Sequence, residues 1–221
     1  MGTQSRRRLL GAAGAAALVA VAAPARGAIA QDPSPAASPA ASPVAVAARE
    51  VPSDEATADQ LAIAQAEGAA YGRALAAMAQ QAEVRTQTAG QYEVSLVAEP
   101  AEGLYQVTGG KPAWTEPGDA NAHLEVAVRD AGDGRFVPGL TISLALQAPD
   151  GSPVATQTMP FVWHPWLYHY GLNWTVPGAG DYTATVRIEP PDFARHDQQN
   201  GDRYADPVEL TFSIPITPGQ K

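Results

Sequence analysis

In five segments of residues 91–216, apolar and polar residues alternate, and this period of two constrains the fold more than any other feature of the chain. Successive side chains of a strand point to opposite faces of a sheet, so each segment predicts a strand with one buried face. Turn-forming residues separate segments at 130–134, 149–151 and 177–180. We therefore expect residues 91–216 to form an all-β domain, an Ig-like antiparallel β-sandwich. The apolar positions are Tyr92, Val94, Leu96, Leu124, Val126, Val128, Ile142, Leu144, Leu146, Tyr182, Ala184, Val186, Ile188, Val208, Leu210, Phe212 and Ile214.

Residues 1–30 have the composition of an export signal. A run of three arginines (residues 6–8) precedes an apolar, Ala-rich run over residues 11–23, and small residues follow up to Ala30. This order is typical of a twin-arginine signal peptide with a cleavage site near Ala30. The apolar run is shorter than the roughly 20 residues of a membrane-spanning helix, so an uncleaved anchor is the less favoured alternative. We expect export by the twin-arginine pathway to a periplasmic or extracytoplasmic location, with the protein soluble after cleavage.

Two segments separate this signal from the predicted sandwich. Residues 31–52 are rich in Pro, Ala and Ser without apolar periodicity, which predicts a disordered linker. Residues 53–85 are Ala-rich, and Ser53 with the two acids after it is typical of a helix N-terminus. We expect this helix to pack on the following domain; pairing with a second copy or docking on a membrane partner are alternatives. Gly68 and Gly72 lower its intrinsic stability by roughly 1 kcal/mol each.

The charge and the absence of cysteine restrict the partners of the chain. The formal charge is −9, and removal of residues 1–30, which contain four arginines and no acid, would change it to −13. An acidic surface repels nucleic acid and attracts cations, so we expect no nucleic-acid partner. Without cysteine, a transition metal would be held by imidazole and carboxylate groups.

All four histidines lie in the C-terminal half of the chain. His123 and Glu125 are two residues apart in a predicted strand whose apolar residues occupy the other face, so both side chains project from one face. Side chains so placed could bind one ion together. The alternative is an ordinary solvated polar face, which is the default for the outside of a sandwich.

The other histidines lie outside the regular alternation. His164 and His169 belong to an aromatic segment, residues 159–171. Their spacing would place them on opposite faces of a straight strand, but Pro165 favours an edge or a loop in which both could reach one pocket. The neighbouring aromatic residues would form a wall that limits water or, alternatively, an aromatic core with two hydrogen-bonded histidines: Trp163, Trp166, Tyr168 and Tyr170. His196 lies in a predicted loop, where a lone histidine is otherwise most often solvated.

Five short motifs follow one another along the domain: Ala-His-Leu-Glu at 122–125, Gly-Arg-Phe-Val-Pro-Gly at 134–139, His-Tyr-Gly-Leu-Asn at 169–173, Pro-Gly-Ala-Gly-Asp-Tyr at 177–182 and Pro-Pro-Asp-Phe-Ala-Arg-His at 190–196. In content and order they resemble the exported P19/Tp34-type iron transport family. The resemblance implies an Ig-like sandwich, a homodimer, binding of copper and iron(II), and cooperation with a membrane iron permease. It also implies metal ligands at His123, Glu125, His169 and His196, with His164 as an additional metal-linked histidine.

One position departs from the family pattern. A methionine ligand is common seven residues before the His-Tyr-Gly histidine, and this chain has Val162 there. Loss of a thioether removes the soft ligand that favours Cu(I) and leaves imidazole and carboxylate, which suit Cu(II), Fe(II) or Zn(II). The acidic Asp-Gly stretch common before the histidine is also replaced, by residues 165–168.

We expect a non-enzymatic, exported metal-binding protein that captures divalent iron or copper, with zinc as a further candidate ion, and supplies it to a membrane iron-uptake system. The expected ligands are His123, Glu125, His164, His169 and His196. Two alternatives remain open. A small copper-dependent oxidoreductase would use an open metal position. A metal-independent binding module would instead use an exposed aromatic patch: Trp163, Trp166, Tyr168 and Trp174.

Overall fold

The computed structural model of the protein describes residues 53–219. The predicted signal peptide (1–30), its cleavage site near Ala30 and the predicted linker (31–52) lie outside the described residues. Within residues 53–219, no helix combines the length and the apolar character needed to cross a membrane.

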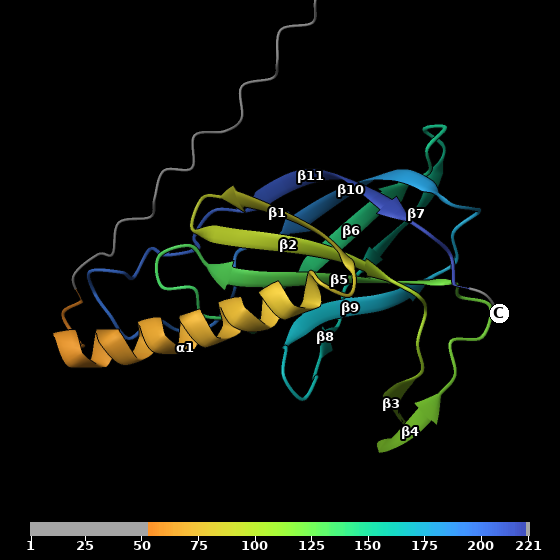
Figure 1. The fold of residues 1–221 in the computed structure, drawn as a ribbon. Helices are drawn as coiled ribbons and strands as arrows, with labels where there is room; N and C mark the ends of the chain where they lie inside the picture. The colour runs from red at the N-terminus through yellow and green to blue at the C-terminus, as the bar shows by residue number, and fades with distance from the viewer. Residues whose placement is uncertain (1–52, 220–221) are drawn as a thin grey trace, which may run out of the picture. The chain divides into compact units, whose positions relative to one another are not determined.

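A helix, α1 (Ala58–Met78), precedes a series of strands (Figure 1). The strands are β1 (Glu83–Ala89), β2 (Tyr92–Glu99), β3 (Leu104–Thr108), β4 (Lys111–Thr115), β5 (Ala122–Asp130), β6 (Ile142–Gln147), β7 (Pro153–Thr158), β8 (Phe161–Val162), β9 (His169–Trp174), β10 (Gly180–Ile188) and β11 (Val208–Ile216).

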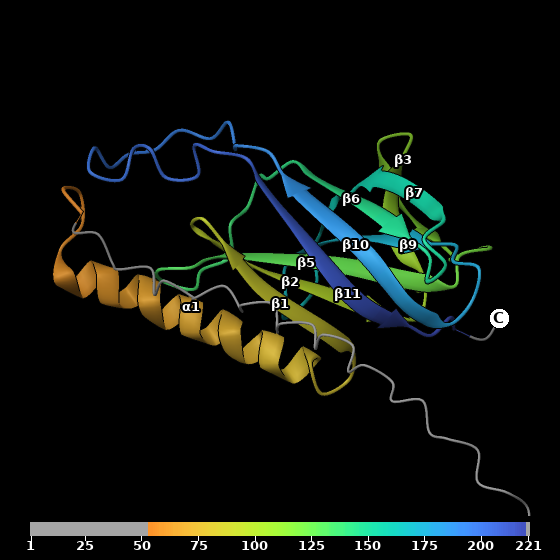
Figure 2. The ribbon, with the colours of Figure 1, turned by 90° about the horizontal axis from the view of Figure 1, so that it is seen from above.

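Two antiparallel sheets form a sandwich (Figure 2). One sheet has the order β1-β2-β5-β9-β8 and the other the order β11-β10-β6-β7, while β3 and β4 form a separate hairpin. Buried residues of both sheets make one hydrophobic cluster that includes Leu96, Val126, Leu144, Val186 and Phe212. The predicted β-sandwich is confirmed, and the alternating segments of the sequence correspond to β2, β5, β6, β10 and β11.

The first sheet begins earlier than the alternation indicates. Strand β1 pairs with β2 from Glu83 to Ala89, so the sandwich starts at Glu83 and not at residue 91. None of the side chains of β1 is fully buried, and several are exposed. An edge strand of this kind carries little hydrophobic periodicity, which is why the sequence pattern did not show it.

The helix is shorter than the predicted range of residues 53–85. Its N-cap is Thr57 and not Ser53: Thr57 and Gln60 form a capping box, in which each side chain accepts a hydrogen bond from the other's backbone N–H. Ser53 instead accepts hydrogen bonds from the backbone N–H groups of Glu55 and Ala56 in the turn before the helix. At its C-terminal end the helix stops at Met78, and residues 83–85, which were expected to be helical, belong to β1 and pair with β2.

The helix packs on its own domain, on the outer face of the first sheet. Leu75 and Met78 form a second hydrophobic cluster with Val97 of β2, Ala127 of β5 and Leu167. Gly68 makes the closest approach, because a Cβ atom added there would lie 1.8 Å from the Asp133 carbonyl oxygen. This glycine therefore allows helix and turn to touch, which outweighs its low helix propensity.

We predict that Gly68→Ala destabilises the protein, although the same change in a solvent-exposed helix stabilises by up to about 1 kcal/mol. Overpacking against the Asp133 carbonyl should cost roughly 1–3 kcal/mol of unfolding free energy, measured by thermal melting with circular dichroism. The matched control is Gly72→Ala, one turn later, whose Cβ atom would meet only the end of the flexible Arg129 side chain. Equal melting temperatures for the two variants would contradict the close approach at Gly68.

Candidate metal centre

The candidate ligands lie on the outer face of the first sheet. In β5, Leu124 and Val126 point into the sandwich core, and His123 and Glu125 project from the opposite face, as predicted. The register places two polar residues directly beside His123, Glu99 of β2 on one side and Asn173 of β9 on the other. Three neighbouring strands therefore supply one polar cluster.

This part of the outer face is buried and not solvated. The relative exposure of His123 is 0%, that of Glu125 is 2% and that of His169 is 1%. Helix α1 and Leu167 cover the adjacent surface, since Leu167 is itself buried against Leu75 and Met78. The alternative of an ordinary solvated polar face is therefore wrong for these residues.

Three side chains converge on one point. Glu125 Oε1 lies 3.2 Å from His169 Nε2 and 3.8 Å from His123 Nε2. One ligand atom from each of the three residues lies within 4.8 Å of the others. His123 Nε2, His169 Nε2 and Glu125 Oε2 are all buried without a hydrogen-bond partner. A single unsatisfied polar group costs about 1–3 kcal/mol, so three at one point indicate a site built to receive a cation.

The second nitrogen of each imidazole is held by an acceptor. His123 Nδ1 is 2.8 Å from Asn173 Oδ1, and His169 Nδ1 is 3.2 Å from the Leu167 carbonyl oxygen. Asn173 Nδ2 in turn donates to the Glu102 carbonyl at 2.7 Å, which fixes its amide with Oδ1 towards His123. Each Nδ1–H can then donate, which leaves the Nε2 lone pair of both rings free for a metal ion.

Gly171 leaves room at the same point. It lies between His169 and Asn173 on β9 and opposite Glu125 on β5. A Cβ atom at this position would lie 2.8 Å from His123 Nε2 and 3.1 Å from His169 Nε2. Any other residue would fill the space between the imidazoles, so the local backbone fits the presence of a ligand there.

The electrostatics of the centre come from three carboxylates. Burial, and then the charges of Glu99 and Glu102, raise the pKa of Glu125 to about 8. Burial and the nearby Glu102 likewise raise the pKa of Glu99. Glu102 Oε1 lies 3.8 Å from His123 Nε2, and its side chain is 45% exposed. A cation would relieve the repulsion among these groups, and the exposed Glu102 connects the buried centre to solvent.

The sequence did not identify Glu99 and Glu102 as members of this centre. Glu99 reaches it because the antiparallel register pairs it with His123. Glu102 reaches it because its backbone N–H and carbonyl both bond to the Asn173 side chain. The sequence signal was the alternation in residues 92–98, whose polar positions continue to Glu99 at the end of the strand. That alternation does not show which residue of the neighbouring strand Glu99 faces.

His169 is held in its neutral form. Burial is the main cause that lowers its pKa to about 4, and the nearby His123 and His164 act in the same direction. A neutral imidazole is the form that binds a metal ion. Protons therefore compete with a cation at this ring only in acidic solution.

His164 borders the centre without belonging to the convergent group. Its ring centroid lies 6.3 Å from that of His169 and 5.3 Å from that of Trp166. Its Nδ1 is buried and has no hydrogen-bond partner. The bent segment predicted from Pro165 thus brings both histidines of the aromatic segment to the same region.

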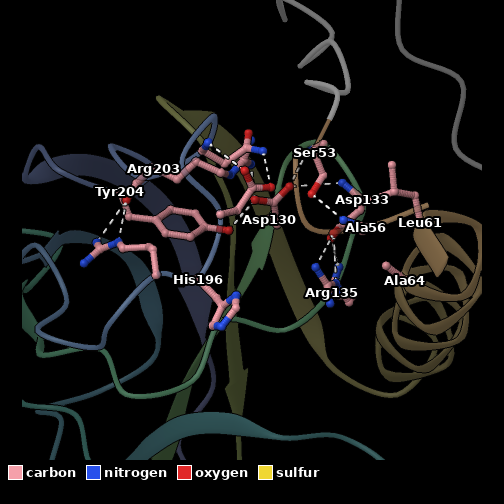
Figure 3. A pocket seen from close by; sticks show the side chains of 14 residues that line it. Ser53, Ala56, Leu61, Ala64, Asp130, Asp133, Arg135, His196, Arg203 and Tyr204 are labelled. Carbon is pink, nitrogen blue, oxygen red and sulfur yellow. Dashed lines mark hydrogen bonds and ion pairs between the residues drawn. The ribbon is translucent and has the colours of Figure 1, made fainter. Parts of the chain in front are cut away.

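His196 lies in a different pocket, of about 340 Å³, which includes Asp130, Arg135 and Tyr204 (Figure 3). Its side chain is 92% exposed, and its Nδ1 is 3.3 Å from Glu55 Oε2. The structure does not group it with the other ligands. The expectation that all four histidines share one pocket is therefore not met within one copy of the described chain.

The aromatic residues are arranged differently from the predicted wall. Trp163, Trp166 and Tyr168 are exposed, with Trp163 at 68%. Tyr170 faces the sandwich core, where its hydroxyl donates to the Val137 carbonyl. Trp174 is also a core residue, only 1% exposed, so it cannot belong to an exposed aromatic patch. The aromatic residues therefore do not form the single wall that the sequence predicted.

Val162 of β8 pairs directly with His169 of β9. Side chains of such a pair project from the same face. The position where the family commonly has methionine is thus next to the centre, and here it carries no donor atom.

Comparisons with known proteins give a family match and structures of similar fold. Residues 114–215 match the family model described as Fe2+ transport protein. FetP of uropathogenic Escherichia coli strain F11 has a solved structure that is 25% identical over 63% of this chain and 97% of FetP, with a TM-score of 0.52.

Two copper-bound structures share the fold at lower identity. A variant of Campylobacter jejuni P19 is 22% identical over 63% of this chain and 98% of P19, with a TM-score of 0.53. A variant of FetP is 23% identical over 63% of this chain and 94% of its own, with a TM-score of 0.52. No curated protein sequence matches the chain. The resemblance to the P19-type iron transport family is confirmed.

We predict that Glu125→Gln stabilises the metal-free protein at pH 8. The folded state raises the pKa of this carboxyl from 4.5 to about 8, so it binds a proton more tightly than the unfolded chain does. The unfolding free energy of the wild type therefore falls as the pH rises from about 4.5 to about 8. Removal of this cost should raise the melting temperature at pH 8 by at least roughly 2–4 °C, which corresponds to about 1 kcal/mol.

The same variant should lose at least about tenfold in metal affinity, because it lacks an anionic ligand. Glu209→Gln is the matched control, since Glu209 is exposed on β11 of the other sheet. A Glu125→Gln protein that melts below the wild type at pH 8 would show that the carboxyl does not carry the burial cost assigned to it.

Proposed function

We propose that this chain, whose residues 114–215 match the Fe2+ transport protein family, is an exported protein that captures divalent iron or copper and supplies it to a membrane iron-uptake system. The observation that carries the proposal is the convergence of His123, Glu125 and His169, whose buried ligand atoms have no other partner. We further propose that export follows the twin-arginine pathway, on the basis of residues 1–30.

The donor set favours ions that prefer nitrogen and oxygen. His123 and His169 offer neutral imidazole nitrogens, and Glu125 offers a carboxylate that would lose its proton as the ion binds. Val162 supplies no thioether opposite His169. We therefore propose a preference for Fe(II) and Cu(II), with Zn(II) as a further candidate, over Cu(I).

Each residue near the centre has a separate task in this proposal. Glu102, at the solvent side of His123, attracts the cation, and Glu99 adds negative charge behind it. Asn173 orients His123 through Nδ1. His164, which borders the centre with a free Nδ1, is available as an additional ligand.

His196 has a place in this proposal through a second copy of the chain. The family resemblance implies both a homodimer and a ligand at His196, whereas one copy leaves the ring exposed and away from the cluster. The two expectations are compatible if His196 of one copy reaches the centre of the other. We propose this arrangement for the dimer.

The proposed role is binding and delivery without catalysis. A small copper-dependent oxidoreductase differs from it in turning over a substrate once loaded with copper. A metal-independent aromatic module would depend on exposed residues such as Trp163 and would be unaffected by loss of His169.

We predict that the metal-stripped chain from residue 31 onward binds Fe(II), Cu(II) or Zn(II) with near-stoichiometric saturation in calorimetric titrations. His169→Ala should abolish this binding, since it removes one of the buried ligands. His196→Ala should weaken it and lower the dimer fraction in sedimentation, because the proposed dimer places this ring in the centre of the other copy. Wild-type binding no tighter than about 0.1 mM, which is roughly 5.5 kcal/mol, would contradict the proposed function.

A further inference from the structure

Helix α1 lies outside the residues that match the iron transport family, yet it contacts the segment that carries two of the histidines. Leu167 is 1% exposed and packs with Leu75 and Met78 of α1. The next residue, Tyr168, accepts a hydrogen bond of 2.6 Å at its backbone carbonyl from the hydroxyl of Tyr71, also in α1. The helix thus holds the two residues that immediately precede His169.

These contacts bear on the orientation of the His169 ring. The Leu167 carbonyl is the acceptor for His169 Nδ1, so the position of Leu167 determines which way the ring turns its Nε2. That Nε2 lies 3.2 Å from Glu125 Oε1. A shift of the 167–168 backbone would therefore move a ligand atom relative to the other two, without any change in the ligands themselves.

Tyr71 is well placed for this task. Its ring packs against Phe136 with centroids 5.6 Å apart, which restricts its rotation. Burial, and then the Glu125 charge, raise the pKa of Tyr71, so its hydroxyl stays protonated and able to donate. The glycine contacts of α1 with the turn at residues 133–134 hold the helix itself against the domain.

A cleft of about 290 Å³ lies between α1 and the same segment. Tyr71, Phe136, His164 and Tyr168 are among the residues that line it. Beside this cleft, Leu167 packs against Leu75 and Met78, and the Tyr168 ring packs against Phe136. Among the described residues, the hydrogen bond from Tyr71 to Tyr168 is the polar contact that joins the two sides.

We propose that Tyr71 is a positioning residue of the metal centre: its hydrogen bond to the Tyr168 carbonyl keeps the segment 163–168 closed over the cluster and fixes the His169 ring. The proposal rests on the proposed function, because it concerns the same centre. Its consequence is that α1, a part of this chain outside the family match, controls how fast a captured ion leaves.

The test compares Tyr71→Phe with Tyr182→Phe. Tyr182 is the control, because its hydroxyl also donates to a backbone carbonyl, that of Gly178, at 2.6 Å, but on β10 in the other sheet. Each variant loses one hydrogen bond donated to a backbone carbonyl. Cu(II) is the probe, its release to an excess of chelator is timed, and its electron paramagnetic resonance spectrum is recorded.

For Tyr71→Phe we expect release about two- to tenfold faster than wild type, the range that corresponds to one hydrogen bond, and a changed Cu(II) spectrum. Tyr182→Phe should release copper at the wild-type rate with the wild-type spectrum. In the metal-free protein, amide hydrogen exchange of a peptide covering residues 163–170 should be faster in Tyr71→Phe alone.

The hydrogen-exchange arm separates this inference from the proposed function. If wild type does not bind Cu(II), Fe(II) or Zn(II), the proposed function fails, and exchange still reports whether Tyr71 holds the segment. If wild type binds copper and Tyr71→Phe matches it in release rate, spectrum and exchange, the positioning role of Tyr71 is wrong.

Discussion

The central constraint on this structure is a polar cluster that is buried although three of its ligand atoms have no hydrogen-bond partner. His123, Glu125 and His169 lie on the outer face of a sandwich, where polar side chains are ordinarily solvated, and yet all three are almost completely enclosed. Burial removes water from His123 Nε2, His169 Nε2 and Glu125 Oε2 without offering a hydrogen bond in exchange. Such a cluster opposes folding, and a cation is the partner that matches two imidazoles and a carboxylate.

Other parts of the fold stabilise and position this polar cluster. The two sheets bury a continuous apolar core, which supplies the stability that the polar cluster reduces. Strand register then brings Glu99, His123 and Asn173 side by side, and Gly171 keeps the space between the imidazoles open. Helix α1 adds the cover, and its close contact at Gly68 makes that cover part of the domain.

The features that the sequence predicted correctly are those that follow from local periodicity. Alternation identified the strands of the core and placed His123 and Glu125 on one outer face, because side-chain direction in a strand follows from position alone. The helix was expected to pack on the domain, but alternation did not show which face α1 and Leu167 cover, since both lie far from β5 in the chain. Glu99 belongs to the centre because β2 pairs with β5, and His196 lies apart from the centre because of the path of a long loop. Neither the strand pairing nor the loop path can be read from a short motif.

The most direct test of the central claim is an anomalous diffraction map from crystals of the protein loaded with Cu(II) or Fe(II). The expected result is one strong peak bounded by His123 Nε2, His169 Nε2 and the Glu125 carboxylate, with unchanged positions for Asn173 and Gly171. A peak confined to surface carboxylates, or density for a water molecule and no metal between the three ligand atoms, would contradict the claim that this cluster is built to hold a cation.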